Sequence, residues 1–487
     1  MTDSSPIQTG QGGPRATPIG AFLSRASLGA IGGRLRRMLG GRVAIATSWT
    51  VAAMIVGQII RLAGNLIMTR ILAPEMFGVM SIVLSVQITL LVLLDIGIRT
   101  AVIQSAQGDD ERLLNTAWTF QIIRGVSVWL AIALFAIFLP VATAWGWFAE
   151  GSAWASPDLP AVLAVASLSM IIASLESTNT ITSQRQLKLK RVALLQLVGQ
   201  LAGFAAMIAL GLLTSSIWAL VSSGIVSAAV VTVASHLYLP GIRNRLALHP
   251  EACRELSSFA GWILVSSITF VLASNIDRLV FGGVVDAGTL GLYSIALNLV
   301  LMVETLGGAV LGMVILPALS QTAREQPDQL RQKYLRFRYL YDVAILCAAG
   351  GIFASGPAVI KILYDDRYLD AGTMLAILSF SMISSRYNLA GTAYLALGKP
   401  KYLAILNLCK LVSITILLPL AYEVWGFYGA MYAVALYMLP VLPIIFWLNS
   451  RLSLNSLKAE LVTPGAWIIG YGLGLCLTTF LSIFMLV

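Results

Sequence analysis

Charged side chains are scarce in this chain. Only 11% of its 487 residues are Asp, Glu, Lys or Arg, whereas soluble domains carry about 25%. Hydrophobic residues make up 58% of the chain. A soluble protein with so few charges could not cover its surface with polar groups. The composition therefore excludes a soluble globular protein and predicts a polytopic membrane protein.

Residues that hold metals, disulfides or nucleotides are equally sparse. The two histidines and four cysteines form neither a CxxC pair nor an HExxH pattern, so we expect no metal site and no disulfide framework. A GxxxxGK[ST] phosphate loop is missing, which argues against an ATP-driven pump. The net charge of +10 is explained by the basic residues that mark the cytoplasmic loops of membrane proteins, so it does not indicate binding of nucleic acid. We expect no cofactor and no nucleic-acid partner.

Long uncharged runs predict an all-α integral membrane protein with about 13 transmembrane helices, because about 20 apolar residues span a bilayer as helix. The predicted helices are 44–68, 76–98, 113–140, 159–181, 192–212, 215–239, 257–281, 288–316, 338–360, 372–396, 402–421, 425–448 and 465–487. They divide into an N-terminal lobe at 44–240, a C-terminal lobe at 241–450 and an extra helix within 451–487. Residues 1–43 are rich in Gly, Ser, Pro and Arg and are predicted to form a disordered basic tail.

The distribution of basic residues indicates how these helices are oriented across the membrane. If the tail and every second loop are cytoplasmic, 24 of the 32 Lys and Arg residues lie on that side and only three on the other. This asymmetry follows the positive-inside rule and predicts a cytoplasmic N-terminus. The connections reach only about twenty residues, as between helices in a bundle rather than a globular domain. We therefore expect the protein to act within the membrane.

A weak internal repeat relates the two lobes. The segment "APEMFGVMSIVLS" at 73–85 aligns with "DAGTLGLYSIALN" at 286–298 at an offset of 213 residues, pairing Gly78 with Gly291. Each segment leads into the second helix of its lobe. Because each lobe contains six predicted helices, an even number, the two lobes have the same orientation, which predicts parallel repeats with a substrate site between them.

Five basic residues fall inside the predicted helices: Arg61, Arg124, Arg278, Arg386 and Lys410. A charge at a helix centre costs roughly 2.5–3.5 kcal/mol on insertion scales, so such residues usually face a cavity or a partner. The repeat offset places Arg278 at position 65, one helical turn from Arg61 and on the same face. We expect these cations to line a path for an anionic cargo, with buried structural pairing as the alternative for Arg124.

Four carboxylates in the membrane zone are candidates for ion coupling or for structural pairing: Asp95, Glu176, Asp277 and Glu304. Asp95 and Arg99 are spaced i, i+4 and are predicted to pair. Trp118, Trp129 and Trp262 could stack on sugars, although interfacial or lipid-facing positions are the common alternative.

Two segments carry a family resemblance. "TRILAPEMFGVMSIVLSVQITLLVLLDIGIRTAVIQ" at 69–104 resembles the opening signature of the polysaccharide-transporter family, the Wzx-type oligosaccharide flippases of the MATE-like MOP superfamily. "NIDRLVFGGVVDAGTLGLYSIA" at 275–296 resembles its second-half element. The matching positions are Arg70, Leu72, Pro74, Phe77, Gly78, Asp95, Gly97 and Gln104, and then Asn275, Asp277, Gly291 and Tyr293. The similarity runs over roughly 44–450.

The resemblance implies a flippase, not an enzyme, in the bacterial inner membrane. Such proteins move undecaprenyl-diphosphate-linked oligosaccharides to the periplasmic leaflet by alternating access, in exopolysaccharide, capsule or lipopolysaccharide biosynthesis. The implied partners are the lipid-linked oligosaccharide, membrane lipids, and the polymerase and glycosyltransferases of the same pathway. The family's cationic cavity is bordered by helices 1, 2, 7 and 8, which include Arg61 and Arg278.

Two other functions compete with this one. A MATE-type multidrug antiporter would carry cations, which five basic residues inside the helices disfavour. A membrane polysaccharide polymerase or ligase usually needs a large outer loop, and the longest here, 141–158, is short.

Overall fold

The computed structural model describes residues 40–95, 97–258 and 262–484, and the surroundings of side chains at 49–95, 97–256 and 265–480. Throughout these residues the secondary structure is helical, without a strand. Ten helical stretches are long and apolar enough to cross a membrane, or eleven if one bent pair counts as a span. The predicted all-α membrane fold is confirmed. The tail predicted at 1–43 lies almost entirely outside the described residues.

The predicted count of thirteen spans is not confirmed, and the differences have local causes. Predicted helix 372–396 forms three short pieces, α16 (Asp370–Leu378), α17 (Ser381–Ser385) and α18 (Asn388–Ala396). Predicted helices 402–421 and 425–448 correspond to two helices that meet at a kink within α19 (Pro400–Leu436), and together they are counted as one stretch among the ten. A kink at Gly426, with φ 67° and ψ −159°, turns the chain there, a conformation that favours glycine.

The predicted helix 159–181 is broken. It forms α6 (Leu159–Ala166) and α7 (Leu168–Ser174), and α8 (Asn179–Arg185) follows after a bend of 61°. Serine, threonine and asparagine are dense in this region, and their side chains compete with the helical backbone for hydrogen bonds. Ser174 Oγ, for example, donates to Ile171 O at 2.6 Å.

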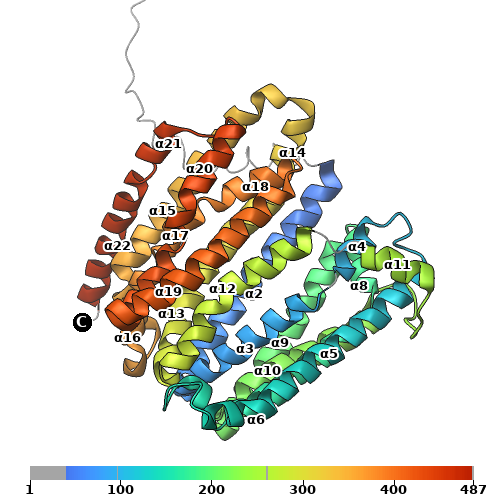
Figure 1. Ribbon diagram of the computed structural model, residues 1–487, viewed down its shortest axis with the longest axis horizontal. Helices are drawn as coiled ribbons and strands as arrows, with labels where there is room; N and C mark the ends of the chain where they lie inside the picture. The colour runs from blue at the N-terminus through green and yellow to red at the C-terminus, as the bar shows by residue number, and fades with distance from the viewer. Residues whose placement is uncertain (1–39, 96, 259–261, 485–487) are drawn as a thin grey trace, which may run out of the picture.

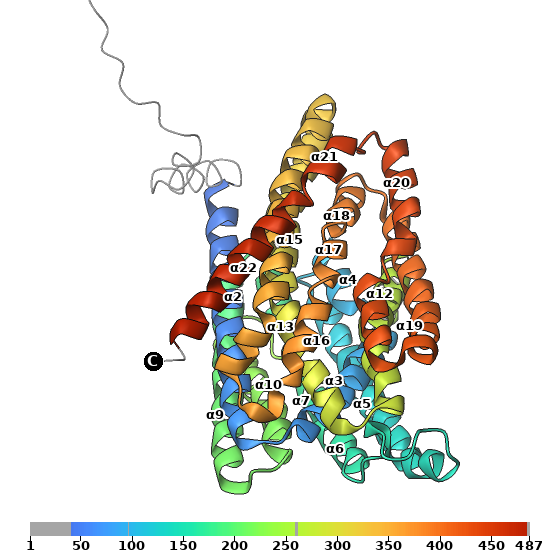
Figure 2. The same ribbon diagram turned by 90° about the vertical axis from the view of Figure 1, so that its left-hand side faces the viewer.

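The N-terminal half is a bundle around two helix pairs. α9 (Leu189–Thr214) packs along α10 (Trp218–Tyr238), and α2 (Gly40–Ile71) lies on α9. α5 (Glu111–Ala144) packs on α6 and α7. Figures 1 and 2 show this bundle beside the C-terminal half, with α2 next to α9 in Figure 2.

The C-terminal half contains α12 (Trp262–Val284), α13 (Ala287–Val310), α15 (Leu330–Leu363) and α19. A π-helical turn at Leu311–Ile315 joins α13 to α14 (Leu316–Glu325). α12 packs on α19, and α13 packs on α16. The two halves meet where α3 (Pro74–Leu93) crosses α12 and α13. Figure 1 shows the halves separating from there toward α14 on one side and toward α4 (Ile98–Gln104) and α11 (Pro250–Ser258) on the other.

The repeat offset of 213 appears directly in the crossing of α3 and α13. A Cβ atom added to Gly78 would lie 1.9 Å from the carbonyl oxygen of Ala287. A Cβ added to Gly291 would lie 1.9 Å from the carbonyl oxygen of Pro74. Both glycines and both carbonyl residues are related by the same offset. The crossing is therefore two-fold symmetric, and its close approach requires glycine on both helices.

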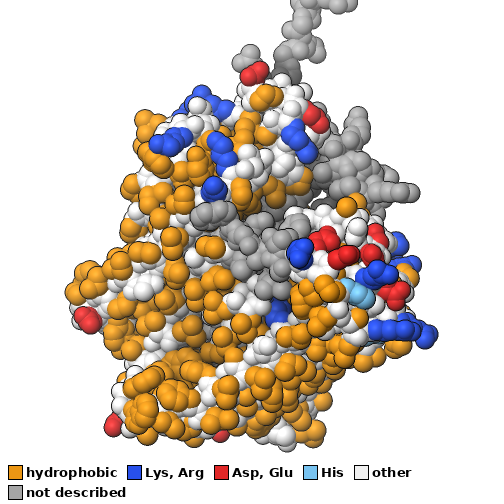
Figure 3. Space-filling view, turned by 45° about the vertical axis from the view of Figure 1, so that its right-hand side comes forward, with side chains coloured by type: hydrophobic (Ala, Val, Ile, Leu, Met, Phe, Trp, Pro, Cys, Tyr) orange, Lys and Arg blue, Asp and Glu red, His pale blue; other side chains and the backbone are white. Residues whose placement is uncertain are grey.

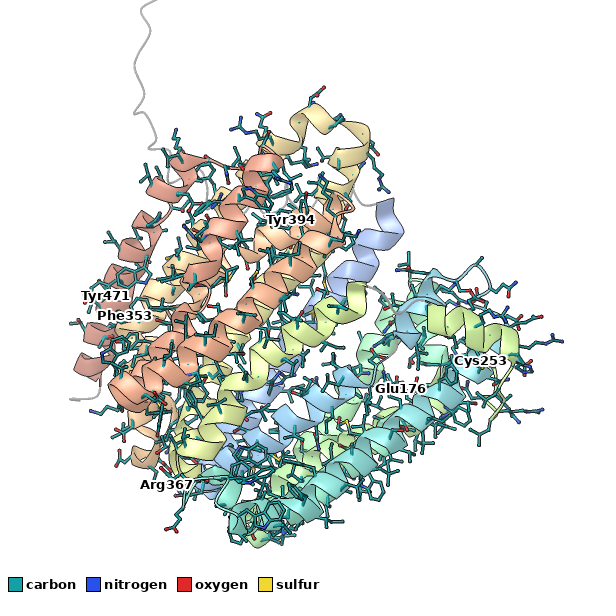
Figure 4. All side chains as sticks on the ribbon, in the orientation of Figure 1. Glu176, Cys253, Phe353, Arg367, Tyr394 and Tyr471 are labelled. Atoms are coloured by element: carbon teal, nitrogen blue, oxygen red, sulfur yellow. The ribbon has the colours of Figure 1, made fainter. Side chains whose placement is uncertain are left out.

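The extra C-terminal unit predicted within 451–487 consists of α21 (Leu457–Val462) and α22 (Gly465–Phe484), and α20 (Leu442–Arg451) precedes it. α22 packs along α15. The rings of Phe353 on α15 and Tyr471 on α22 lie 6.0 Å apart between their centroids, and Figure 4 labels both. The segment that precedes α12 belongs spatially to the other half, because α11 packs on α4 and α5. The lobe boundary at 240/241 stays a prediction.

Side-chain type varies along the molecule. On the face in Figure 3, hydrophobic side chains cover the lower and left parts, and charged side chains gather at the top and right. This is the pattern of a helical bundle whose apolar belt faces lipid and whose loops face water.

Candidate functional site

One end of the molecule, which we call the closed end, is formed by the loops 72–74, 145–158, 285–287 and 364–369. A latch from the N-terminal half crosses it. Trp154 Nε1 donates to Leu279 O at 2.8 Å, and Ala153 N donates to Val285 O at 2.9 Å. Trp154 is 5% exposed and stacks on Phe148 with ring centroids 5.5 Å apart. The last turn of α12 is thereby held by the N-terminal half.

A second latch crosses in the opposite direction. Arg367 Nη2 donates to Thr69 O at 3.0 Å, and Tyr368 Oη donates to Leu72 O at 2.9 Å. Figure 4 labels Arg367 at this end of the molecule. Leu72 and Val285, one acceptor from each latch, are again 213 residues apart. The C-terminal half thus holds the last turn of α2 as the N-terminal half holds that of α12.

A charged cavity of about 330 Å³ lies within the C-terminal half, among α12, α13, α17, α18 and α19. Arg278, Glu304 and Lys410 line it. Glu304 Oε1 accepts hydrogen bonds from Ser381 Oγ at 3.0 Å and from Ser385 Oγ at 2.6 Å. We call this cavity, which Asn388 also lines, the charged cavity.

The basic groups of the charged cavity have only neutral hydrogen-bond partners among the described side chains. Arg278 Nη1 donates to Asn275 Oδ1 at 3.1 Å, and Lys410 Nζ donates to Asn388 Oδ1 at 3.2 Å. Neither forms an ion pair within 4.0 Å to another described residue. A guanidinium and an ammonium held this way keep their charge available for an anion.

Asp277 also lines this cavity but has a different partner from its neighbour Arg278. It is 3% exposed and accepts a hydrogen bond from Tyr293 Oη on α13. Its second oxygen, Oδ1, is buried without a partner among the described residues. The carboxylate fastens α12 to α13, and the consecutive positions serve different neighbours because they lie on different faces of the helix.

Arg61 lines three adjoining cavities along α2, of about 310, 270 and 180 Å³. The first of them reaches Thr305 on α13, and the third reaches both Leu301 and Thr305. The same two residues line the charged cavity that contains Arg278. The structure therefore brings Arg61 and Arg278 to opposite sides of one stretch of α13, between the two halves.

Asp95 does not pair with Arg99, and that prediction is wrong. Asp95 Oδ1 lies 2.5 Å from Arg124 Nη1, whereas Arg99 Nε donates to Gln184 Oε1 at 3.0 Å. The i, i+4 rule fails because α3 ends at Leu93 and α4 begins at Ile98, so Asp95 and Arg99 share no helix. Arg124 therefore forms a structural ion pair, which was the alternative to lining a path for an anionic cargo.

Arg386 lies outside the four cavities described here, in an ion cluster beneath the extra C-terminal unit. Its Nη2 is 2.5 Å from Glu460 Oε2 on α21, and Arg338 on α15 also pairs with Glu460. Asp342 completes the cluster at 3.5 Å from Arg338. The cluster fastens α21 to α15 and α17. Glu460 was missed from the sequence because its partners are 74 and 122 residues away.

Glu176 follows α7 in the N-terminal half and does not line the charged cavity (Figure 4). The indole nitrogens of Trp118 and Trp129 donate to Leu175 O and Ala164 O, both at 3.3 Å. These tryptophans are thus bonded within their own half. The side chain of Trp262 lies outside the described residues. Searching the described residues for three or more His, Cys, Asp or Glu placed to hold a metal ion finds no such group.

Sequence reasoning also missed a group of carboxamides beside Arg61. Gln58 and Asn65 share its face of α2, and Gln200 approaches them from α9. The signal was present, because Gln58, Arg61 and Asn65 follow the i, i+3, i+7 spacing of one helical face.

Solved structures of two-lobed helical transporters share this fold. An inward closed structure of the lipid II flippase MurJ matches with a TM-score of 0.63 at 14% identity, over 90% of this chain and 98% of that chain. An inward-facing multidrug resistance MATE family transporter of the MOP superfamily matches with a TM-score of 0.59 at 12% identity, over 90% of this chain and 99% of that one. The MATE-like fold class is confirmed.

The family follows from the sequence profile. The profile of the polysaccharide biosynthesis protein family matches residues 67–373, and the chain belongs to that family. Lipopolysaccharide biosynthesis protein WzxC of Escherichia coli (strain K12) is 20% identical over 66% of this chain and 63% of its own length. A putative O-antigen transporter of Shigella flexneri is 22% identical over 47% of this chain and 56% of its own length. The chain thus spans less than two thirds of the length of either relative.

Proposed function

We propose that this protein is a flippase that moves undecaprenyl-diphosphate-linked oligosaccharides across the bacterial inner membrane by alternating access. It delivers repeat units for exopolysaccharide, capsule or lipopolysaccharide assembly. Glycosyltransferases supply its cargo on the cytoplasmic side, and a polymerase consumes it on the periplasmic side. The N-terminus is cytoplasmic, so the closed end faces the periplasm.

The observation that carries this proposal is the position of Arg61 and Arg278. Both line cavities that share Leu301 and Thr305 of α13, one from each half. A guanidinium can bind two phosphate oxygens in a planar fork, so a diphosphate can be held by one arginine from each half. Lys410 adds a third cation in the charged cavity. We assign Arg386 and Arg124, which have carboxylate partners, to structural roles.

The energy for transport can come from the membrane potential. A diphosphate carries about two negative charges, and each charge that crosses the field contributes ~2.3 kcal/mol per 100 mV. Movement of an anion out of a negative cytoplasm is downhill. Glu304 and Asp277 in the charged cavity are the carboxylates placed to add ion coupling.

A MATE-type drug antiporter remains the second candidate, since one such transporter shares the fold. The unpaired Arg278 and Lys410 of the charged cavity disfavour a cationic cargo by direct repulsion. A polymerase or ligase, the enzymatic alternative, is disfavoured by the short outer loops, which leave little surface for an acceptor sugar.

The test is transport of the lipid-linked oligosaccharide in reconstituted vesicles by the wild-type protein and by Arg61→Ala and Arg278→Ala. Loss of a charge-assisted hydrogen bond costs about 1.5–3 kcal/mol, so each variant should slow transport by about 10- to 100-fold. Lysine at either position should restore only part of the rate. Wild-type protein that moves drug cations and not this lipid would overturn the proposal.

A further inference from the structure

Carboxamide side chains from four helices line the cavities around Arg61; Gln184 of α8 accepts a hydrogen bond from Arg99, and the other five are considered together. Gln58 and Asn65 come from α2, Gln196 and Gln200 from α9, and Asn298 from α13. We call these five residues the amide strip. α2 lies on α9, and Asn298 joins Gln58 and Asn65 in the smallest of the three cavities. The strip therefore extends across the space between the two halves.

Several of these amides are placed for a ligand rather than for the protein. Gln58 is 8% exposed and lines two of the cavities, yet its side-chain amide makes no hydrogen bond to another described residue. Gln200 Oε1 is buried and also lacks a partner among the described residues. A buried amide without a partner costs about 1–3 kcal/mol, which a bound polar group would recover.

The charge of the amide strip differs from that of the charged cavity. Among the described residues that line its three cavities, none is Asp or Glu, and Arg61 is the basic residue. The charged cavity holds Asp277, Glu304, Arg278 and Lys410. The two sites meet at Thr305, which lines cavities on both sides.

We propose that the amide strip is the binding site for the sugar portion of the cargo. A carboxamide both donates and accepts hydrogen bonds, as a sugar hydroxyl does, so a row of amides matches a polyhydroxylated chain. Arg61 and Arg278 hold the diphosphate at the junction near Thr305, and the oligosaccharide extends from there along α2 and α9. This inference rests on the proposed function and adds the location of the glycan.

The experiment compares two probes in vesicles that contain the full-length protein. One probe is undecaprenyl diphosphate carrying the complete oligosaccharide, isolated from cells that lack the gene for this chain. The other is undecaprenyl diphosphate carrying a single hexose. The variants are Gln58→Met and Gln196→Met, because methionine keeps the length of glutamine and removes its hydrogen bonds. Gln196 is exposed, so its replacement leaves folding intact.

Loss of one hydrogen bond corresponds to about a fivefold change. We expect each variant to slow the complete probe about fivefold and to leave the single-hexose probe within about twofold. Arg278→Ala should slow both probes. The matched control is Gln87→Met, since Gln87 is 5% exposed, its Nε2 lacks a partner among the described residues, and it lines none of the cavities described here. It should transport both probes at the wild-type rate.

The outcomes separate the two proposals. Equal slowing of both probes by the glutamine variants, or no slowing of either, overturns the assignment of the sugar site and leaves the flippase intact. Wild-type protein that moves neither probe overturns the proposed function, and the sugar site with it.

Discussion

The two latches of the closed end use different donor groups, yet each holds one backbone carbonyl that is equivalent to a carbonyl held by the other. The latch from the N-terminal half uses an indole and a backbone amide, packed against Phe148. The latch from the C-terminal half uses a guanidinium and a phenol, with Asp365 bonded to the guanidinium. One acceptor of each latch, Val285 O and Leu72 O, nevertheless lies 213 residues from the other, whereas Leu279 O and Thr69 O do not follow the offset. The repeat has kept the position of one backbone acceptor, while the donor side chains have diverged.

Both latches depend on the crossing of α3 and α13, so breaking the crossing should have the largest effect. Gly78→Leu places a side chain where even a Cβ would lie 1.9 Å from Ala287 O. We expect at least a tenfold loss of transport, because the overlap is with backbone and only separation of the helices relieves it. The measurement is transport in vesicles together with the amount of protein in the membrane. Gly472→Leu on α22 is the control, because a Cβ added there has no neighbour within 4 Å and Gly472 lines none of the cavities described here.

Removing one donor from each latch tests whether the two are equivalent. Trp154→Phe removes the hydrogen bond to Leu279 O, and Tyr368→Phe removes the bond to Leu72 O. Each should shift the equilibrium toward opening of the closed end by about fivefold, the equivalent of ~1 kcal/mol.

The measurement is the rate at which an impermeant maleimide, added from the periplasmic side, labels a cysteine placed at Ser274 in the charged cavity. The background must lack Cys253, Cys347, Cys409 and Cys476, which are all free. A large effect of one variant and none of the other would show that a single latch holds the closed end.

Acidification should distinguish the latches by a smaller effect. The hydrogen bond from Arg367 holds the pKa of Asp365 below its ordinary value, although burial opposes this. A carboxylate with a lowered pKa in the folded state contributes stability above its unfolded pKa of about 3.9 and loses it as the pH falls through the folded value. Opening should therefore be constant near neutral pH and increase only below about pH 4.

Asp365→Asn should remove this acid dependence of opening. Trp154→Phe changes the other latch, so it should leave the acid dependence as it is in the wild-type protein. The Arg367 side chain is 46% exposed, so we expect a shift of less than about threefold, as for surface ion pairs. Iodide quenching of a fluorophore already attached at position 274, measured from the periplasmic side between pH 6 and pH 3.5, checks the prediction, because the maleimide reaction itself needs a thiolate. Acid dependence that persists in Asp365→Asn would assign it to another group.

The sequence predicted what depends on periodicity and on repetition. Arg61 and Arg278 could be placed on equivalent helices because the offset of 213 and the helical period were both readable. It could not predict partners that are distant in the chain. Arg124 pairs with a carboxylate 29 residues away, and Arg386 with one 74 residues away. Acceptors such as Leu279 O and Leu72 O are backbone atoms, which any residue type supplies, so the latches left no signature in composition.

The breaks in the helices were equally hidden. The segment 372–396 was predicted as one span from its composition, and it is interrupted beside serine side chains that bond to the backbone or to Glu304. Hydropathy measures solubility in the bilayer and not straightness. The number of spans therefore depends on local geometry that only the folded chain supplies.

The crossing at Gly78 and Gly291 has a consequence for the origin of the molecule. Gly78 faces the carbonyl of Ala287 at the start of α13, and Gly291 faces the carbonyl of Pro74 at the start of α3. Because Pro74 and Ala287 are equivalent in the repeat, the same surface patch of each half meets its counterpart across a two-fold axis. That is the geometry of an isologous dimer. A single ancestral gene for one six-helix unit would have produced this contact as a homodimer with both subunits inserted in the same direction. Two halves in one chain can carry different side chains around the shared axis, as Arg278 and Glu304 on one side and Gln58 and Gln200 on the other illustrate.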